Sequence, residues 1–312
     1  MILTVTMNPS VDISYPLETL TVDSVNRVKT VSKTAGGKGL NVTRVINELG
    51  GKVTATGVLG GHLGRFIMEQ LDHANIPHQF YSILEETRNS IALLHDKGQQ
   101  TEILEAGPTI TQEEKVGFLA EFEQLLSKTK WLTISGSLPN GLQPDFYTHL
   151  IQSANEATIP VLLDTSGSAL KAALMSEHKP TLIKPNLSEI NELLSIELDV
   201  DRPNDVKAAL NDPIFQGIDW LVVTLGGSGA IVKTVGQFYR VLIPKIEVVN
   251  PVGSGDATIA GLAYAFSQSS TTEEIIKTAM TTGVLNALEP TTGHIDTTRF
   301  YDIYEQVEIS SY

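Results

Sequence analysis

Residues 250–266 read NPVGSGDATIAGLAYAF, a turn of small residues followed by one carboxylate and an apolar run. Gly253 and Gly255 allow backbone N–H groups to converge, and the helix expected after them adds the positive end of its dipole. Such a turn binds an anion. The position of Asp256 directly behind it therefore needs an explanation.

Two roles for Asp256 are open at this point. Asp is a favoured residue at helix N-caps, so a purely structural role is one interpretation. A carboxylate repels an anion held in the same turn, however, which makes capping a poor use of the position. Beside a transferring phosphoryl group, the carboxylate would instead accept the proton of an attacking hydroxyl, while N–H groups from Val252 to Asp256 stabilise charge. The flanking glycines favour this second interpretation.

The overall charge excludes several classes of partner. The chain has 312 residues, of which 36 are acidic and 22 basic, for a net charge of −14. This balance argues against nucleic acid or an anionic membrane as the main partner, and the lack of cysteine excludes disulfides and thiol catalysis. No apolar stretch reaches the roughly 18 residues of a membrane span. Because the N-terminus also lacks the basic region of a signal peptide, we expect a cytoplasmic protein.

Strand-like apolar runs alternate with amphipathic helical stretches along the chain. This alternation predicts right-handed βαβ crossovers, and hence a single three-layer α/β domain over residues 1–312 with a mostly parallel central sheet. The predicted strands are Ile2–Thr6, Val53–Leu59, Trp131–Ser135, Val161–Asp164, Leu182–Lys184 and Trp220–Leu225. The predicted helices are Leu40–Leu49, Gly64–His73, Gln112–Leu126, Pro144–Asn155 and Thr272–Leu288.

Residues 12–34 and 88–105 break this rhythm, because they alternate like strands and carry no helical pattern. Within the second segment, IALLHDKGQQTEILE (91–105) predicts a hairpin around Lys97 and Gly98. We interpret the two segments as one small β-sheet lid beside the main sheet, formed discontinuously, and not as a separate domain.

A second glycine-rich motif, AGGKGLNVTRVINELGG, spans residues 35–51. It surrounds Lys38 with glycines and places Asn41 just inside a helix. The spacing fits neither a Walker A loop nor a Rossmann fingerprint. A solvated lysine in a glycine turn is the structural alternative.

Two shorter motifs follow predicted strands. KPNLSEINELL (184–194) places Asn186 and Glu189 three residues apart at a helix start, where Glu189 would hold Mg²⁺ directly or through water, or would complement the helix dipole. TLGGSGA (224–230) would lie against a nucleotide phosphate or form a hairpin turn. Each motif is ambiguous when it is taken alone.

In this order the motifs resemble the PfkB branch of the ribokinase-like sugar kinases over essentially the whole chain. AGGKGLNVTRV looks like the first signature of that family, and NPVGSGDATIAG looks like the second, whose aspartate is the catalytic base. TMNPSVD and TEILEAGP (101–108) look like the phosphosugar kinases, and SYPLETL and NRVKTVSKTAGGKGLNVTRV are most similar to the tagatose-6-phosphate kinases. In two departures, Asn250 replaces a common acidic residue and Ser254 replaces a common alanine; neither disturbs the base or the turn.

The resemblance implies a ribokinase-like fold, ATP and Mg²⁺ as cofactors, and phosphorylation of D-tagatose 6-phosphate at its C1 hydroxyl. Asp256 would be the catalytic base, and Gly253, Ser254 and Gly255 would form the anion hole with it. The N-x-x-E pattern of Asn186 and Glu189 is similar to the magnesium-organising motif of the family. The other residues expected at the nucleotide by resemblance are Lys184, Thr224, Gly226, Gly229 and, near the adenine, Asn286.

Local cations must hold a phosphorylated sugar on so acidic a chain. Lys38, beside Gly37 in its glycine turn, is the first choice. Arg88 at the start of the predicted hairpin is the second, and the family places a substrate-binding arginine there. Arg27 is the third, although a surface role is equally consistent with it. By resemblance Asp12 and Asn41 would bind sugar hydroxyls, and Ser137 would reach the sugar or its phosphate.

The edges of a small exposed sheet invite pairing, so we expect a homodimer formed through the lid. Two other functions remain open. A 1-phosphofructokinase would use the same residues on a sugar with its phosphate at the other end, and the sequence fixes neither that orientation nor the C4 stereochemistry. A non-catalytic sugar-phosphate sensor on the same fold is the second, since fold alone does not establish catalysis.

Overall fold

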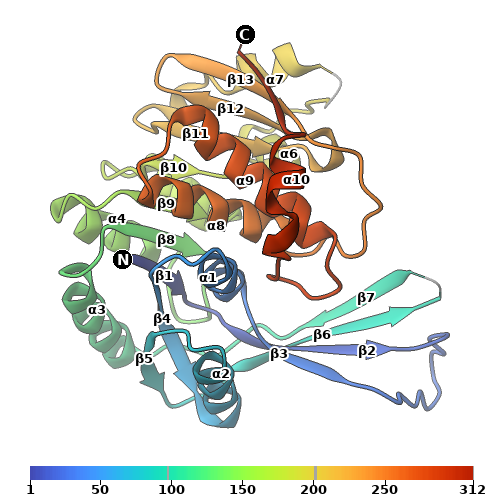
Figure 1. Cartoon of the computed structure of the whole chain (residues 1–312). Coiled ribbons are helices and arrows are strands. Elements are labelled where there is room, and N and C mark those ends of the chain that lie inside the picture. The colour runs from blue at the N-terminus through green and yellow to red at the C-terminus, as the bar shows by residue number, and fades with distance from the viewer. Residues whose placement is uncertain (97, 200–201, 312) are drawn as a thin grey trace.

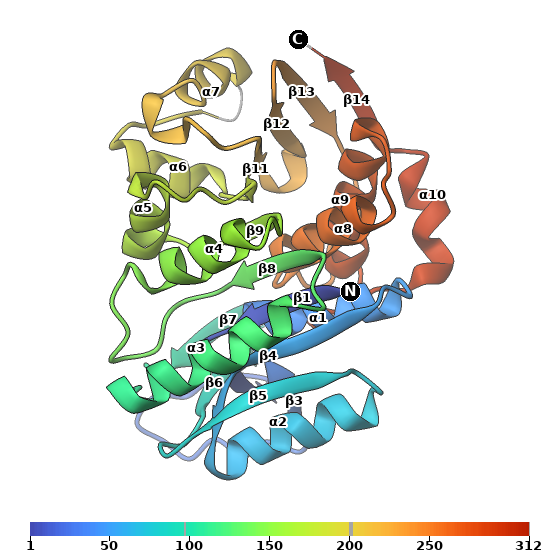
Figure 2. The same cartoon turned by 90° about the vertical axis from the view of Figure 1, so that its left-hand side faces the viewer.

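The computed structural model describes residues 1–96, 98–199 and 202–311. Within them, a ten-stranded sheet runs in the order β14-β13-β12-β11-β10-β9-β8-β1-β4-β5 (Figures 1 and 2). The strands from β11 to β5 in this order are parallel, and β12, β13 and β14 extend one edge in antiparallel fashion. The strands are β1 (Ile2–Thr6), β4 (Val53–Gly60), β5 (His78–Ile83), β8 (Trp131–Ser135), β9 (Val161–Asp164), β10 (Leu182–Ile183), β11 (Trp220–Thr224), β12 (Ala230–Thr234), β13 (Gln237–Leu242) and β14 (Glu308–Ser311).

Both faces of the large sheet are buried, because consecutive residues of its strands enter different cores. In β11, Leu221 and Val223 pack in the core on one face and Val222 packs in the core on the other. Helices α3 to α7 cover the first face, and α1, α8, α9 and α10 cover the second (Figure 2). The helices are α1 (Lys38–Glu48), α2 (Gly61–His73), α3 (Gln112–Leu126), α4 (Phe146–Glu156), α5 (Gly167–Met175), α6 (Leu187–Leu194), α7 (Pro203–Ala209), α8 (Ser254–Ser267), α9 (Thr272–Ala287) and α10 (Phe300–Tyr304).

A second, four-stranded sheet projects beside the main one (Figure 1). This small sheet has the order β3-β2-β6-β7 and consists of β2 (Ser10–Pro16), β3 (Ser32–Gly36), β6 (Arg88–His95) and β7 (Gln99–Leu104). The segments around residues 12–34 and 88–105 meet where β2 pairs in parallel with β6. β6 and β7 form the predicted antiparallel hairpin; of its two predicted turn residues, Lys97 lies outside the described residues.

The predicted fold class is confirmed: a three-layer α/β arrangement with a mostly parallel sheet and a smaller separate sheet. Every strand and helix predicted above is present, with small shifts at the ends; α2, for example, begins at Gly61 and not at Gly64. The prediction missed β5, β12, β13 and β14, and the short helices α5, α7 and α10. Helices of nine residues or fewer give too few turns for a clear 3.6-residue period.

The carboxyl ends of the parallel strands define one edge of the sheet, where ligands bind in open α/β folds. Asn8 follows β1, Gly136 and Ser137 follow β8, Asp164 ends β9, and Lys184 follows β10. In the described part of the chain, no helix has the length and apolar character needed to cross a membrane.

Candidate active site

The turn of residues 250–255 leads into the N-terminus of α8. Gly253 is the N-cap residue, with a φ of 84° that glycine adopts without strain. Among the described residues, the backbone N–H groups of Gly253, Gly255 and Asp256 donate no hydrogen bond. The N–H groups of Val252 and Ser254, in contrast, donate to Asn250 Oδ1 and to the carbonyl oxygen of Pro251. Three N–H groups of the five that the sequence suggested are therefore free for an anion.

Asp256 is the third residue of α8, and only 6% of its surface is exposed. It does not cap the helix, since Gly253 occupies that position. Its Oδ2 instead accepts a hydrogen bond of 2.8 Å from Asn41 Nδ2 on α1. The carboxylate therefore faces the second glycine-rich motif of the sequence, 215 residues away along the chain.

The surroundings of Asp256 raise its pKa to about 6. Burial is the largest cause, and repulsion from Asp164 adds to it; attraction to Lys38, the hydrogen bond from Asn41 and attraction to Lys184 act in the opposite direction. A carboxyl group with this pKa is mostly ionised at neutral pH but accepts a proton more readily than an ordinary aspartate. This property is expected of a general base.

Asp164, at the carboxyl edge of the sheet, forms ion pairs with two lysines. Its Oδ1 lies 3.4 Å from Lys184 Nζ, and its Oδ2 lies 3.8 Å from Lys38 Nζ. Attraction to Asp164 is also the largest cause that raises the pKa of Lys38. A Cβ atom added to Gly255 would lie 3.1 Å from Lys184 Nζ, so this ammonium group lies against the anion-binding turn. The two ammonium groups add positive potential beside the turn.

A cavity of about 180 Å³, here called the sugar cavity, lies at the carboxyl ends of β1, β8 and β9. Of the predicted substrate residues, Gly37, Lys38, Arg88 and Ser137 line it. Buried side-chain oxygens of Thr6, Asn8 and Ser135 also belong to the lining residues and have no hydrogen-bond partner among the described residues. Such unsatisfied groups are costly unless water or a polar ligand pairs with them. The cavity therefore suits a polyhydroxylated molecule.

Arg88 is held at the wall of the sugar cavity by main-chain oxygens. Its Nε and Nη2 each donate to the carbonyl oxygen of Asn8 over 3.3 Å, and its Nη1 donates to that of Glu105 over 3.1 Å. Among the described residues, no carboxylate lies within ion-pair distance of this guanidinium, although Asp12 and Glu105 are close enough to favour its charged form. An anionic group on the ligand can therefore use that charge.

Asp12 lies on β2, beside the last residues of β3. Its Oδ1 accepts a hydrogen bond of 2.7 Å from Ser10 Oγ. A Cβ atom added to Gly36 would lie 2.0 Å from the carboxylate, so this position of Asp12 requires glycine there. Burial is the largest cause that raises the pKa of Asp12, and Arg44 and Arg88 act against it.

Asn186 and Glu189 form a reciprocal capping box at the start of α6. Asn186 Oδ1 accepts from the Glu189 N–H over 2.9 Å, and Glu189 Oε2 accepts from the Asn186 N–H over 2.8 Å. The described residues contain no group of three or more His, Cys, Asp or Glu side chains that could hold a metal. Mg²⁺ commonly binds through one or two carboxylates with water and substrate phosphates. Glu189 Oε1 accepts no hydrogen bond within the described part of the chain, so Glu189 fits that kind of site and not a cage built from protein alone.

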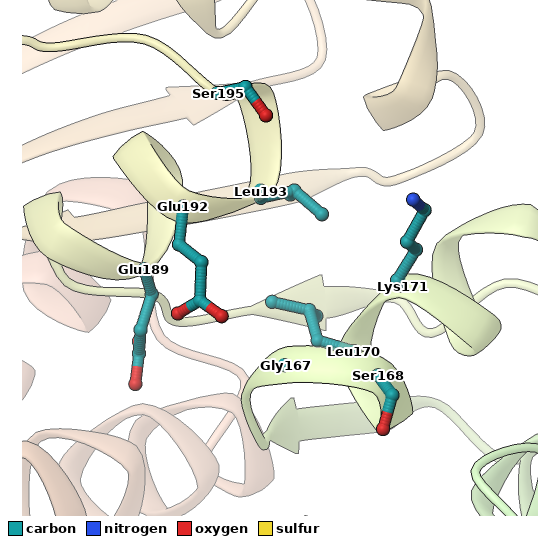
Figure 3. Close-up of a pocket in the computed structure, with 8 residues that line it drawn as sticks. All are labelled: Gly167, Ser168, Leu170, Lys171, Glu189, Glu192, Leu193 and Ser195. Carbon is teal, nitrogen blue, oxygen red and sulfur yellow. The ribbon is translucent and has the colours of Figure 1, made fainter.

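A second cavity, of about 230 Å³, lies between α5 and α6. Figure 3 shows the side chains of Glu189 and Glu192 extending from α6 in the direction of α5, which borders the opposite side of the cavity. Glu189 is the one predicted site residue that lines it. The other lining residues are Gly167, Ser168, Leu170, Lys171, Leu193 and Ser195.

With this geometry in view, comparison with known proteins identifies the family. The model of the pfkB family carbohydrate kinases matches residues 5–299. The chain belongs to the PfkB family. The predicted resemblance to PfkB kinases is thereby confirmed.

Solved structures similar to this PfkB kinase cover nearly its whole length. Escherichia coli phosphofructokinase-2 has a TM-score of 0.89 and 27% identity, over 97% of this chain and 98% of that chain. A Staphylococcus aureus protein provisionally named a phosphofructokinase has a TM-score of 0.85 and 31% identity, over 100% of this chain and 99% of that one. A Thermotoga maritima protein provisionally named a 1-phosphofructokinase has a TM-score of 0.90 and 25% identity, again over 100% and 99%.

The two glycines predicted at the nucleotide differ in their surroundings in this PfkB kinase. TLGGSGA forms the turn between the antiparallel strands β11 and β12, and Thr224 is the last residue of β11. A Cβ atom at Gly229 would lie 2.1 Å from the carbonyl oxygen of Val241, so the close approach of this main chain requires glycine at position 229. Gly226 has a φ of 56° and nothing within 4 Å of an added Cβ atom, so it is open to a ligand.

Asn286 supports the anion-binding turn from behind. It is 1% exposed, and its Nδ2 donates to the carbonyl oxygen of Val252 over 2.9 Å. Its Oδ1 accepts from the Gly293 N–H over 2.8 Å. Because both ends of the amide are engaged inside the protein, Asn286 has a structural role at the turn, and its contact with the adenine stays a prediction.

Two further residues differ from their predicted surroundings. Asn41 was expected at the sugar, but its amide lies between Asp256 and Arg44. Arg27 is exposed in the segment between β2 and β3 and does not line the sugar cavity. Sequence reasoning did not single out Arg44, and it assigned no role to Asp164, which was a candidate only as a polar residue at a strand end. The available signals were the spacing of Asn41 and Arg44 on one helix face and the position of Asp164 at a strand end.

Proposed function

We propose that this PfkB kinase phosphorylates D-tagatose 6-phosphate at the C1 hydroxyl, giving D-tagatose 1,6-bisphosphate and ADP from ATP. The observation that carries the proposal is Asp256, a buried carboxylate with a pKa of about 6 beside a turn with free N–H groups. A proton acceptor at an anion-binding turn suits phosphoryl transfer to an alcohol. A protein that only binds sugar phosphates gains nothing from it.

In this proposal, each residue of the site has a separate role in phosphoryl transfer. Asp256 accepts the proton of the attacking hydroxyl, and the free N–H groups of the turn stabilise negative charge on the transferring group. Lys184, against Gly255, adds a positive charge at the same place. Mg²⁺-bound ATP supplies the phosphoryl group. Asn186 and Glu189 would organise the water shell of the ion.

The cations that line the sugar cavity suit a substrate that already carries a phosphate. Lys38 and Arg88 both line it, on a chain whose net charge is −14. Ser137 adds a hydroxyl to the same wall. An uncharged sugar would offer no anionic group to these two cations, so we favour a phosphosugar over free ribose or a nucleoside.

The choice of tagatose 6-phosphate rests on the motifs quoted above. The specific rival is fructose 1-phosphate, because a similar solved structure bears the name 1-phosphofructokinase. The two sugars present their phosphates at opposite ends. The polar lining of the sugar cavity is compatible with both orientations.

A substrate panel tests this choice. We expect kcat/KM with Mg²⁺-ATP to be at least about tenfold higher for tagatose 6-phosphate than for fructose 6-phosphate or fructose 1-phosphate. Unphosphorylated tagatose is the control and should be at least about a hundredfold poorer, since Lys38 and Arg88 then bind no phosphate. A clear preference for fructose 1-phosphate would replace our assignment by 1-phosphofructokinase.

We also infer that two chains associate through the small sheet. β3 and β7 are its edges, and each has one strand neighbour within this sheet. Apolar side chains on and near β7 are exposed: Ile103 by 53%, Leu104 by 60% and Leu94 by 39%. Unpaired strand edges together with exposed apolar residues favour association, and a second copy of the chain offers a matching surface.

Light scattering coupled to size-exclusion chromatography tests the association. The wild type should elute as a dimer at micromolar concentration, and I103K/L104K should elute as a monomer, because buried lysines in an apolar interface are costly. V235K is the matched control: Val235 is 80% exposed in the turn between β12 and β13, far from the small sheet in sequence. A wild type that is monomeric throughout would remove this inference.

A further inference from the structure

Arg44 is the cation whose contacts the proposed function leaves unexplained. It lies on α1, one turn after Asn41, and three different segments bind its guanidinium group. Its Nη1 donates to the carbonyl oxygen of Ala35 on β3 of the small sheet. Its Nη2 and Nε donate to the carbonyl oxygens of Thr292 and Gly293, over 3.1 and 3.3 Å, in the segment after α9.

The fourth acceptor of Arg44 is the Asn41 side chain. Arg44 Nη2 donates to Asn41 Oδ1, while Asn41 Nδ2 donates to Asp256 Oδ2 over 2.8 Å. A guanidinium has donors only, so the edge of the amide that faces it must be the oxygen. The NH₂ group of Asn41 is thereby turned toward the carboxylate of Asp256. With the amide reversed, two oxygens would face each other and two donors would face each other.

We propose that Arg44 is a positioning residue that fixes the orientation of the Asn41 amide, and that it thereby keeps Asp256 ionised and aimed as the proton acceptor. The proposal rests on the proposed function, in which Asp256 is the base. Among the described residues, the hydrogen bonds of Arg44 reach neither the anion-binding turn nor the residues that line the sugar cavity. It acts through Asn41.

The charges around both groups give the direction of the effect. Asp256 is faced by Asp164 from β9, by Lys38 from α1 and by Lys184 from the end of β10. Arg44 is buried near three carboxylates, those of Asp12, Glu48 and Asp256, which favour its charged form. Loss of Arg44 removes a cation and frees the Asn41 amide to rotate away from Asp256. Both changes raise the pKa of Asp256, so protonation should inactivate the enzyme at higher pH.

The pH dependence of kcat/KM for the sugar phosphate measures this effect. In the wild type, activity should fall on the acid side with a midpoint near the pKa of Asp256, about 6. In R44M, we expect this midpoint to move up by about half a pH unit or more. The loss of activity relative to the wild type should therefore be larger at mildly acidic pH than at alkaline pH. An R44M midpoint equal to that of the wild type would overturn the proposal.

A second anchor of the same segment provides the matched control. Glu48, also on α1, accepts from the Ile295 N–H over 2.9 Å and contacts His294 Nδ1 at 2.5 Å, without touching Asn41. E48Q therefore weakens the attachment of the segment after α9 but leaves the amide of Asn41 fixed. We expect E48Q to lower the melting temperature and to leave the acid midpoint in place. If E48Q and R44M shift the midpoint equally, Arg44 serves only as a structural anchor and the proposal fails.

Two further variants keep the test decisive if R44M folds poorly. R44K keeps the charge but cannot reach all four acceptors from one nitrogen, so its midpoint should lie between those of the wild type and R44M. N41A should shift the midpoint upward by itself, and R44K/N41A should shift it no further, because Arg44 acts through Asn41. Additive shifts in the double variant would contradict the proposal.

Failure of the base assignment gives a different result. If D256N retains the turnover and the acid midpoint of the wild type, then Asp256 is not the base and the proposed function fails with it. If D256N loses turnover but R44M keeps the wild-type midpoint, then only the role of Arg44 is wrong. The two outcomes are read from separate variants in the same assay.

Discussion

Replacing Asp256 by Asn should lower kcat at least about a hundredfold, the low end for loss of a general base. Asn has nearly the same shape and can still pair with the Asn41 amide through its oxygen, so the local packing should persist. The free N–H groups of the turn and Lys184 remain in place. The affinity for Mg²⁺-ATP, measured by calorimetry, should therefore change little.

The matched control is D219N. Asp219 is exposed and directly precedes β11, at the amino ends of the parallel strands and opposite the site. It should keep wild-type kcat. Loss of turnover in D256N alone would also exclude a non-catalytic sensor, whereas wild-type turnover in D256N would remove Asp256 from its role.

Stability gives an independent check on the same variant. The raised pKa of Asp256 means that the folded protein favours its protonated form, so ionisation of this carboxyl costs stability. That cost is absent below the unfolded value of 3.8, grows as the pH rises, and is complete above about 6. Since Asn carries no charge, D256N should melt at the same or a higher temperature than the wild type at about pH 8. The difference should shrink as the pH falls toward 4.

Much of the fold could be predicted from the sequence because its parallel strands are buried on both faces. The runs Trp131–Ser135 (WLTIS) and Val161–Asp164 (VLLD) are each predominantly apolar, and both are strands with those bounds. The strands that escaped prediction lie at the margins. β14 has exposed and half-buried residues and pairs only with β13, so tertiary contacts and not its own pattern determine it.

The site could be predicted only in part. Glycine-rich motifs and the catalytic carboxylate can be recognised from a short stretch of sequence, whereas residues that hold them in place through long-range contacts cannot. GSGD indicated an anion-binding turn, and Asp256 lies there with unpaired N–H groups. The sequence could not show that the Asn41 amide faces Asp256, since the two lie 215 residues apart. Nor could it distinguish a capping Glu189 from a metal-organising one, because a carboxylate with two oxygens can do both.

Replacing Lys184 by Met should weaken ATP binding by roughly ten- to a hundredfold, the range expected for one lost contact to a charged group. Lys184 Nζ lies against Gly255 and 3.4 Å from Asp164 Oδ1, with 5% of the residue exposed. The variant removes the cation beside the anion-binding turn. It leaves Lys38 in the sugar cavity, so KM for the sugar phosphate should change much less than KM for ATP.

Lys184→Met should also destabilise the protein, because Asp164 is 2% exposed and, of its two ion-pair partners among the described residues, would keep the more distant Lys38. Breaking a buried pair by removing one partner costs about 3 kcal/mol or more. The double variant K184M/D164N removes the uncompensated carboxylate and should recover much of the lost unfolding free energy, but it should not recover ATP affinity, since no cation returns to the turn. K128M, at an exposed lysine after α3, controls for the loss of one positive charge. Urea unfolding and calorimetric ATP titration measure the two effects separately, and recovery of ATP affinity in the double variant would show that Lys184 serves Asp164 and not the nucleotide.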